Sequence, residues 1–439
     1  MTPPRPTTSL RRELGLGSAV MLGLGSMVGA GVFVSLGLGA GLVGPAVLAA
    51  IVLAGGLAMC NGLSSAQLAA AHPVAGGTYE YAHRVGWPAL GAVAGAMFLV
   101  AKSASCATAA LGLAGYVLHR FDASGLAIPG ALAVVVILMV AVLEGIRRTN
   151  AVNTAVVAVT LVGLAVFVAG GIGGVDTANF SPWMYALGGD LIVYNHATWP
   201  DFVYATALMF VAYTGYGRIA TLGEEVENPR KTIPKAIVAT VLVCVAVYTA
   251  VAAVAVGLVG AEAFAALSWD GADLEAVAQY AGLPGPVRWA VTIAAVTAML
   301  GVILNLLLGL SRVALAMSRR GHLPAVFKKI DDAGTTPGPA VVLSAAIVMG
   351  LVCLGSIRAA WSLSAVTVLI YYGITNACAL KLPPPSRLYP RAFSWLGLVG
   401  CLGLSVFVEP VYWAWAGGLI AATAAWHAAT RKKQNTPAA

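Results

Sequence analysis

The stretch Gly25-Ser26-Met27-Val28-Gly29-Ala30-Gly31-Val32-Phe33 interrupts the first long apolar run of the chain. Its glycines are poorly suited to a helix interior, because each one costs about 1 kcal/mol relative to alanine. Unpaired backbone N–H and C=O groups are also costly in lipid, so irregular backbone survives at that depth only inside protein or beside a wet cavity. We therefore expect the first helix to be broken near its middle and the break to bind a ligand.

The composition places the chain in a membrane. Of its 439 residues, 59% are hydrophobic and 10% are charged, which is far from the average of soluble proteins, and apolar runs of about 18 or more residues recur along the chain. With twelve spans, 19 of the 25 Lys and Arg residues fall on the side of the N-terminus, three fall outside and three lie within spans. The positive-inside rule therefore favours twelve spans with both termini in the cytoplasm. The net charge of +8 is then a signal of topology and of weak attraction to anionic lipid, and nucleic acid is not an expected partner.

The expected spans follow one another from residue 14 to residue 428. They cover about 14–37, 46–70, 88–118, 128–144, 150–171, 201–218, 232–260, 287–317, 338–355, 359–380, 393–408 and 411–428. We expect an outer turn at 39–45 and a shaped loop at 73–81, where Pro and Gly-Gly punctuate the sequence. Thr232 is the expected cap of the seventh span.

A second glycine-interrupted span, with Gly215 and Gly217, begins the second half of the chain about 190 residues after the first. Residues 14–171 and 201–380 thus form two units of five spans with opposite orientation, and 393–428 lie outside the repeat. Paired interrupted helices at corresponding positions indicate an inverted-repeat transporter with its site at the midplane. The alternative is that the glycines only let helices pack closely. We expect residues 1–439 to form one transporter domain.

At these residues the chain resembles the amino acid–polyamine–organocation (APC) superfamily, which shares the leucine-transporter fold. The matching stretches are 25–33, 67–79, 212–234 with its Glu224-Glu225-Val226 and Asn228-Pro229, and, more weakly, 311–324. The resemblance covers nearly the whole chain. It implies an all-α polytopic membrane protein of about 12 transmembrane helices, with a 5+5 inverted repeat, broken helices 1 and 6, and two C-terminal helices.

The resemblance also implies that a substrate amino acid lies between the two breaks. Its carboxylate would meet free amides where the second half of span 1 begins, since a helix N-terminus offers N–H groups and a positive dipole. Its ammonium would meet carbonyls freed in span 6, and Phe210 with Tyr213 would form a lid; ordinary helix packing is the alternative role of these two rings. The expected substrate-binding residues are Met27, Val28, Gly29, Ala30, Gly31, Phe210, Val211, Ala212, Tyr213 and Thr214.

Lys102 is the expected coupling residue. It lies near the middle of the span 88–118, where a charge costs about 3 kcal/mol on insertion scales. Proton-coupled relatives carry a lysine on span 5, seven residues after an asparagine, and counting from Asn153 that position here is Thr160. Lys102 could carry the proton in place of that missing lysine, act as a counter-charge for an acidic or neutral substrate, or serve as a structural partner for a carbonyl. The first two roles disfavour cationic substrates.

Two further features concern gating and ions. Glu224 and Glu225 could form a cytoplasmic gate with Arg84 or Arg319, and solvated surface charge is the alternative. Sodium-using relatives place hydroxyls on span 8 around the ion, whereas residues 300–305 contain no Ser or Thr. We therefore expect sodium-independent transport, with protons as the coupling ion.

The expected function is secondary active transport of amino acids across the cytoplasmic membrane by alternating access, as proton symport or exchange. A polyamine or amine exchanger and a non-translocating nutrient sensor remain as alternatives. We expect no enzyme activity and no cofactor, because no catalytic constellation or metal-ligand spacing is visible. The oligomeric state stays open.

Overall fold

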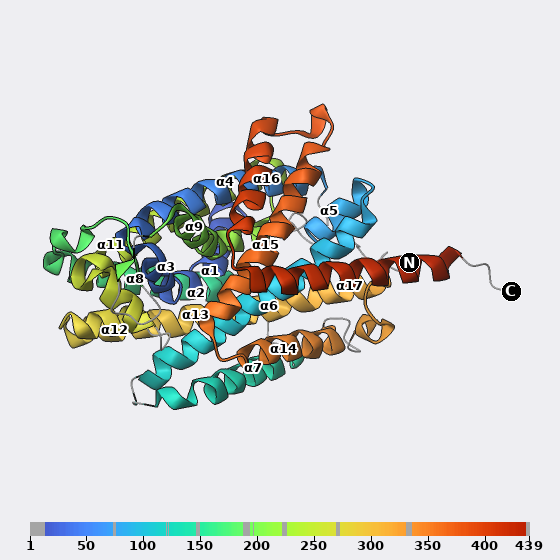
Figure 1. The fold of residues 1–439 in the computed structure, drawn as a ribbon. Helices are drawn as coiled ribbons and strands as arrows, with labels where there is room; N and C mark the ends of the chain where they lie inside the picture. Colours follow the sequence, from blue (N-terminus) through green and yellow to red (C-terminus); the bar gives the residue numbers. More distant parts are fainter. Residues whose placement is uncertain are drawn as a thin grey trace.

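The computed structural model describes residues 14–72, 76–119, 121, 123–145, 150–187, 194–195, 197–221, 226–268, 273–330 and 336–435. Besides turns and irregular segments, this part of the chain consists of helices and one antiparallel pair of strands, in which β1 (Ala186–Leu187) lies beside β2 (Tyr194–Asn195). Most helices run along one bundle, and α17 extends beyond it toward the C-terminus (Figure 1).

The longer helices lie close to the expected spans. They are α1 (Leu16–Met27), α4 (Val47–Ala71), α6 (Pro88–His119), α7 (Ala127–Leu143), α8 (Asn150–Gly171), α9 (Trp199–Tyr213), α11 (Pro229–Leu267), α13 (Gly285–Arg319), α14 (Gly338–Val352), α15 (Ile357–Leu380), α16 (Arg391–Val406) and α17 (Pro410–Asn435). The shorter α-helices are α2 (Ala30–Phe33), α3 (Leu36–Val43), α5 (Thr78–Arg84), α10 (Gly217–Thr221) and α12 (Asp273–Tyr280). Single 3-10 turns occupy η1 (Gly44–Ala46), η2 (Ser124–Leu126), η3 (Ile172–Gly174), η4 (Thr177–Phe180), η5 (Thr214–Tyr216), η7 (Ala325–Lys328) and η8 (Pro384–Ser386).

The bundle is built to lie in a bilayer. Among the described residues, six helices are long and apolar enough to cross a membrane, and α16 with α17 forms a further apolar pair bent by 118°. Large apolar side chains face outward from these helices: Leu53, Val162 and Leu242 are each more than half exposed, as a surface in contact with lipid requires. The chain is therefore an integral membrane protein. Its core runs along α6, which packs against α13 and α15.

Both expected interruptions are present in the structure. The first helix stops at Met27 and helical backbone resumes at Ala30. In the segment expected as the sixth span, α9 changes to the 3-10 turn η5 after Tyr213. We keep the names span 1 and span 6 for these two interrupted segments. The glycine clusters therefore mark real breaks in both helices.

Three local expectations were wrong. Most of the expected outer turn at 39–45 is helix α3, because its glycines let the segment pack closely: a Cβ on Gly39 would lie 2.8 Å from Val47 Cγ2 and 3.0 Å from Met209 Cε. The expected loop at 73–81 becomes helix α5 from Thr78, since Gly77 turns the chain with a φ of +56°. Finally, α11 begins at Pro229 after Asn228 in the left-handed region, so Thr232 lies inside the first turn and is not its cap.

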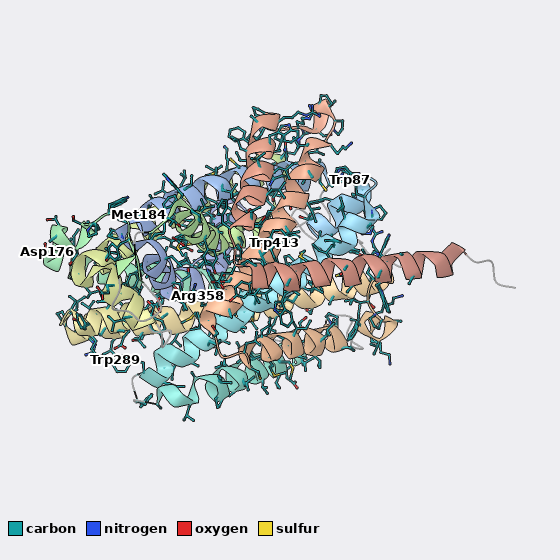
Figure 2. All side chains as sticks on the ribbon, in the orientation of Figure 1. Trp87, Asp176, Met184, Trp289, Arg358 and Trp413 are labelled. Carbon is teal, nitrogen blue, oxygen red and sulfur yellow. The ribbon has the colours of Figure 1, made fainter. Side chains whose placement is uncertain are left out.

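The two ends of the bundle differ in what covers them. We call them the α12 end and the α5 end, after the short helices found there. Figure 2 shows Asp176, Met184 and Trp289 at the α12 end and Trp87 at the α5 end. The site described next lies between these ends.

Candidate functional site

The break in span 1 is packed too tightly for side chains. Val28 follows α1 in an extended conformation, with φ −77° and ψ 98°, and Gly29 precedes α2. A Cβ on Gly29 would lie 2.6 Å from Val302 Cγ2, and one on Gly31 would lie 2.6 Å from Ala212 Cβ. These glycines therefore allow α13 and span 6 to approach the backbone of span 1.

The break in span 6 lies directly against the break in span 1. A Cβ on Gly215 would overlap the carbonyl group of Ser26. Only a residue without a side chain lets the two irregular backbones touch in this way. The fold therefore brings two interruptions, far apart in the sequence, to one place.

Buried side chains satisfy carbonyls that the breaks leave free. The Tyr248 hydroxyl lies 2.9 Å from Met27 O and 3.3 Å from Ala212 O, so one residue of α11 serves both breaks. On the other side, the Tyr372 hydroxyl donates to Thr214 O at 3.1 Å. Irregular backbone at this depth persists because such partners replace the lost helical hydrogen bonds.

Lys102 reaches the break in span 6 from the middle of α6. Its ammonium donates to Thr214 Oγ1 at 2.8 Å and to Thr214 O at 3.3 Å. The residue is only 8% exposed, and it has no carboxylate partner among the described residues. Thr160, where the resemblance would place a lysine, is buried and donates to Val156 O of its own helix. The one lysine at the breaks in this part of the chain therefore comes from α6.

A cavity of about 430 Å³ extends from the breaks toward the α5 end. Ser26, Lys102 and Thr214 line it at the breaks, and Gly76, Gly77, Arg319 and Arg320 line it at the α5 end. One face of α13 forms a continuous wall between them. The cavity can therefore hold a small molecule between the breaks and the α5 end of the bundle.

The route from the breaks toward the α12 end is closed by packing. Phe33 of α2 meets Tyr116 of α6 edge to face, with ring centroids 6.0 Å apart. The Tyr116 hydroxyl donates to Phe33 O at 3.0 Å and accepts from Leu274 N at 3.1 Å. Glu275 of the same short helix α12 is fully buried and pairs with Arg288 at 3.1 Å. The hydrogen bond from Leu274 and the Glu275–Arg288 ion pair thus hold helix α12 against this end of the site.

At the α5 end an ion pair joins α5 to the end of α13. The Arg320 guanidinium donates to both carboxylate oxygens of Glu80, at 2.7 and 2.8 Å. The gate prediction pairs Arg84 with residues 224 and 225. Its Nε atom lies 3.8 Å from Glu80 Oε1, and its side chain is 43% exposed. Glu224 and Glu225 lie outside the described residues, so their part in the predicted gate stays a prediction.

The expected substrate-binding residues divide into two groups in the structure. Thr214 lines the cavity together with Lys102. The other nine are buried beside the breaks and are absent from the cavity wall: Met27, Val28, Gly29, Ala30, Gly31, Phe210, Val211, Ala212 and Tyr213. Phe210 packs edge to face on Tyr372 at 5.9 Å, and Tyr213 packs on Tyr248 at 5.2 Å. Both rings hold the break in span 6 against its neighbours.

Sequence reasoning missed several residues of this site. Tyr248 and Tyr372 lie within regular apolar stretches of α11 and α15, so nothing in their local sequence distinguishes them from ordinary core aromatics. Asn305 and Arg312 of the α13 wall did carry a signal, because polar residues seven positions apart fall on one face of a helix. That spacing, inside a span, could have identified the wall.

Comparison with known proteins places the chain among transporters. Residues 18–437 match the amino acid permease family. An uncharacterized transporter of Mycobacterium tuberculosis is 39% identical over 90% of this chain and 86% of its own length. The branched-chain amino acid permease BcaP of Bacillus subtilis is 27% identical over 91% of this chain and 86% of its own length. The chloroplastic cationic amino acid transporter 9 of Arabidopsis thaliana is 28% identical over 73% of this chain and 58% of its own. With its two broken helices, its central cavity and a family match over nearly its whole length, this chain belongs to the amino acid permease family.

Proposed function

We propose that this permease carries amino acids across the cytoplasmic membrane by alternating access, with both termini in the cytoplasm. The proposed architecture has about twelve spans, with 14–171 and 201–380 as inverted repeats and 393–428 outside them. Support comes from the two adjoining breaks in α1–α2 and α9–α10, at corresponding positions in the proposed repeats. Distribution of Lys and Arg supports the orientation.

The single observation that carries the proposal is the contact of Lys102 with Thr214. The Lys102 ammonium donates a hydrogen bond to Thr214 O, the carbonyl freed in span 6. The substrate ammonium is proposed to bind at this same carbonyl. The carboxylate of the substrate is proposed to meet the backbone around Gly29, Ala30 and Gly31. Substrate and Lys102 would then compete for one carbonyl, and this competition couples the charge of the lysine to the loading of the site.

Proton coupling follows from the surroundings of Lys102. Its hydrogen-bond partners are the neutral carbonyl and hydroxyl of Thr214, so loss of its proton leaves no carboxylate unpaired. Coupling to sodium is not favoured. Sodium-using relatives place hydroxyls of span 8 around the ion, whereas here Val302 of α13, the expected span 8, presents a methyl group to Gly29. Exchange of one amino acid for another uses the same site and remains within the proposal.

The structure represents one state of the proposed cycle. The cavity reaches the α5 end, whereas α12 is fastened over the other end through Tyr116. If the α5 end faces the cytoplasm, as the Lys and Arg distribution indicates, this is an inward-facing state.

The test is uptake by purified protein in proteoliposomes. A panel of labelled amino acids is offered with a pH gradient, without a gradient, and with unlabelled amino acids inside to drive exchange. We expect gradient-driven uptake in the wild type and its loss in Lys102→Ala. Ser344→Ala, at a buried position of α14 that does not line the cavity, should retain it. Exchange that survives in Lys102→Ala assigns the residue to proton coupling. Binding without uptake or exchange under any gradient would refute transport and favour a sensor, and uptake of polyamines alone would favour the amine exchanger.

A further inference from the structure

Asp273 is a fully buried carboxyl group at the α12 end of the molecule. It begins helix α12, between the expected spans 232–260 and 287–317, and its exposed fraction is 0%. Neither of its carboxyl oxygens has a hydrogen-bond partner among the described residues. An ionised carboxylate without a partner is too costly to bury, so a group in this position takes up a proton instead.

Small and neutral groups enclose the carboxyl group of Asp273. Gly37 of α3 lies so close that a Cβ there would be 3.1 Å from Asp273 Oδ2. The Ser268 hydroxyl, at the end of α11, also lies against Gly37 and donates to Phe264 O at 2.8 Å. Burial therefore dominates, and it raises the pKa of Asp273 well above its ordinary value of 3.8.

The charged groups packed against α12 contact Glu275, two residues further along the helix. Arg288 of α13 lies 3.1 Å from Glu275 Oε1, and His119 Nε2 of α6 lies 3.3 Å from Glu275 Oε2. On α11, Glu262 lies near Tyr185, and α3 carries no titratable residue. Within the described part of the chain, the buried aspartate therefore takes part in no ion pair.

Asp273 stays buried only while α12 remains docked on the site. The next amide in the chain, Leu274 N, donates to the Tyr116 hydroxyl at 3.1 Å, and that hydroxyl donates to Phe33 O of span 1. Alternating access requires this end to open, and movement of α12 away from Tyr116 would bring Asp273 into contact with water. The pKa of the carboxyl group would then return toward its ordinary value, and the proton would leave.

We propose that Asp273 is a proton-binding site that keeps α12 closed when it is protonated and favours opening when it is ionised. A proton is the ligand that fits, because the side chain is fully enclosed and does not line the cavity. The described residues also form no cluster that could hold a metal ion. This proton enters and leaves at the α12 end, so it sets the position of α12 without crossing the membrane, unlike the proton proposed for Lys102. The effect on transport rests on the proposed function, whereas the pH sensitivity of α12 does not.

The experiment measures hydrogen–deuterium exchange of α12 in the full chain, purified in detergent. The fragment that contains Asp273–Tyr280 is followed from about pH 5 to about pH 9, where buried carboxyl groups titrate, and the rates are corrected for the intrinsic effect of pH on exchange. Between the pKa values of the open and the closed form, opening releases one proton, so the opening equilibrium should rise about tenfold per pH unit.

Two amide variants separate Asp273 from other acids at this end. Asp273→Asn keeps the size of the protonated group but has no proton to release, so its opening equilibrium should stay low and lose the slope. Asp176→Asn makes the same change at an exposed position of the α12 end and should keep the wild-type slope.

His119 needs its own variant, because a charged His119 would also hold α12 closed through Glu275. His119→Gln should retain the slope assigned to Asp273, and this variant decides the question even if Asp273→Asn fails to fold. Protonation of Glu275 would act in the opposite direction, since it would weaken the pair with Arg288.

Three results would each overturn the inference: a flat corrected profile in the wild type, a wild-type slope in Asp273→Asn, or a lost slope in His119→Gln. None of these measurements depends on transport. Failure to take up or exchange any amino acid would therefore overturn the proposed function and leave the proton site at Asp273 standing.

Discussion

Replacing Gly29 with alanine places a methyl group 2.6 Å from Val302 Cγ2, whereas contacting carbon atoms normally stay about 3.5–4.0 Å apart. The overlap is about 1 Å, and the nearest atom belongs to a side chain. The Val302 Cβ atom is 3.5 Å away, which is ordinary contact. Removing the Val302 methyls should therefore relieve the clash, so the double variant Gly29→Ala with Val302→Ala should be close to wild type.

Gly31 provides the contrasting case. A Cβ there meets Ala212 Cβ at 2.6 Å and also the backbone atom Ala212 Cα at 2.9 Å. Changing Ala212 to glycine removes the first contact but leaves the second. The Gly31→Ala variant can therefore be accommodated only if the backbone of span 6 moves, and Ala212→Gly should not rescue it.

The expected size follows from overpacking of a buried site, which costs about 1–3 kcal/mol. We expect Gly29→Ala and Gly31→Ala each to lose stability of this order and to reduce uptake about tenfold or more. The stability lost in Gly29→Ala should recover to within about 1 kcal/mol of wild type when Val302→Ala is added. Gly56→Ala, where a Cβ meets nothing within 4 Å, is the matched control.

Thermal unfolding in detergent and uptake in proteoliposomes are measured side by side on all variants. Wild-type stability and uptake in both single variants would refute the close approach of α13 and α9 to the backbone at Gly29 and Gly31. Equal rescue by Val302→Ala and by Ala212→Gly would refute the distinction between side-chain and backbone contact.

Three other outcomes are expected. Tyr248→Phe should lower the free energy of unfolding by about 1–3 kcal/mol, because it leaves carbonyls at both breaks without their buried donor. The measurement is the melting temperature, with Tyr280→Phe at an exposed position as the control. Equal melting temperatures of the two variants would contradict this prediction. Burial, followed by the charges of the neighbouring histidines and Arg320, lowers the pKa of His322 from 6.5 to about 4. Because the unfolded chain then binds the proton more readily, stability should fall as the pH drops from about 6.5 to 4, and His322→Gln should flatten this slope; an unchanged slope would contradict the contribution of His322. Uptake should be the same in sodium and in choline buffers, since residues 300–305 lack a hydroxyl, and a collapse in choline would show that sodium is required.

The sequence by itself determined the membrane class, the position of nearly every long helix and the two breaks. Long apolar runs must lie in lipid and must be helical there, so composition and length locate them. Glycine clusters predict helix breaks from sequence because their effect is local: a glycine has a freer backbone and no side chain. The same local reasoning failed at 39–45, where glycines served packing within helix α3, since a glycine does not show from its own sequence which use it serves.

Only the tertiary structure decided what faces the breaks. Lys102 could be recognised as unusual from its depth, but its partner Thr214 is 112 residues away, and no periodicity connects them. Tyr248 and Tyr372 became part of the site because packing of α11 and α15 brings their hydroxyls to freed carbonyls. Whether Arg218 and Arg312 face lipid, protein or a cavity depends on how α10 and α13 are rotated against each other. That rotation is set by the packing of whole helices, so the charge lining the cavity follows from the fold and cannot be read from any single segment.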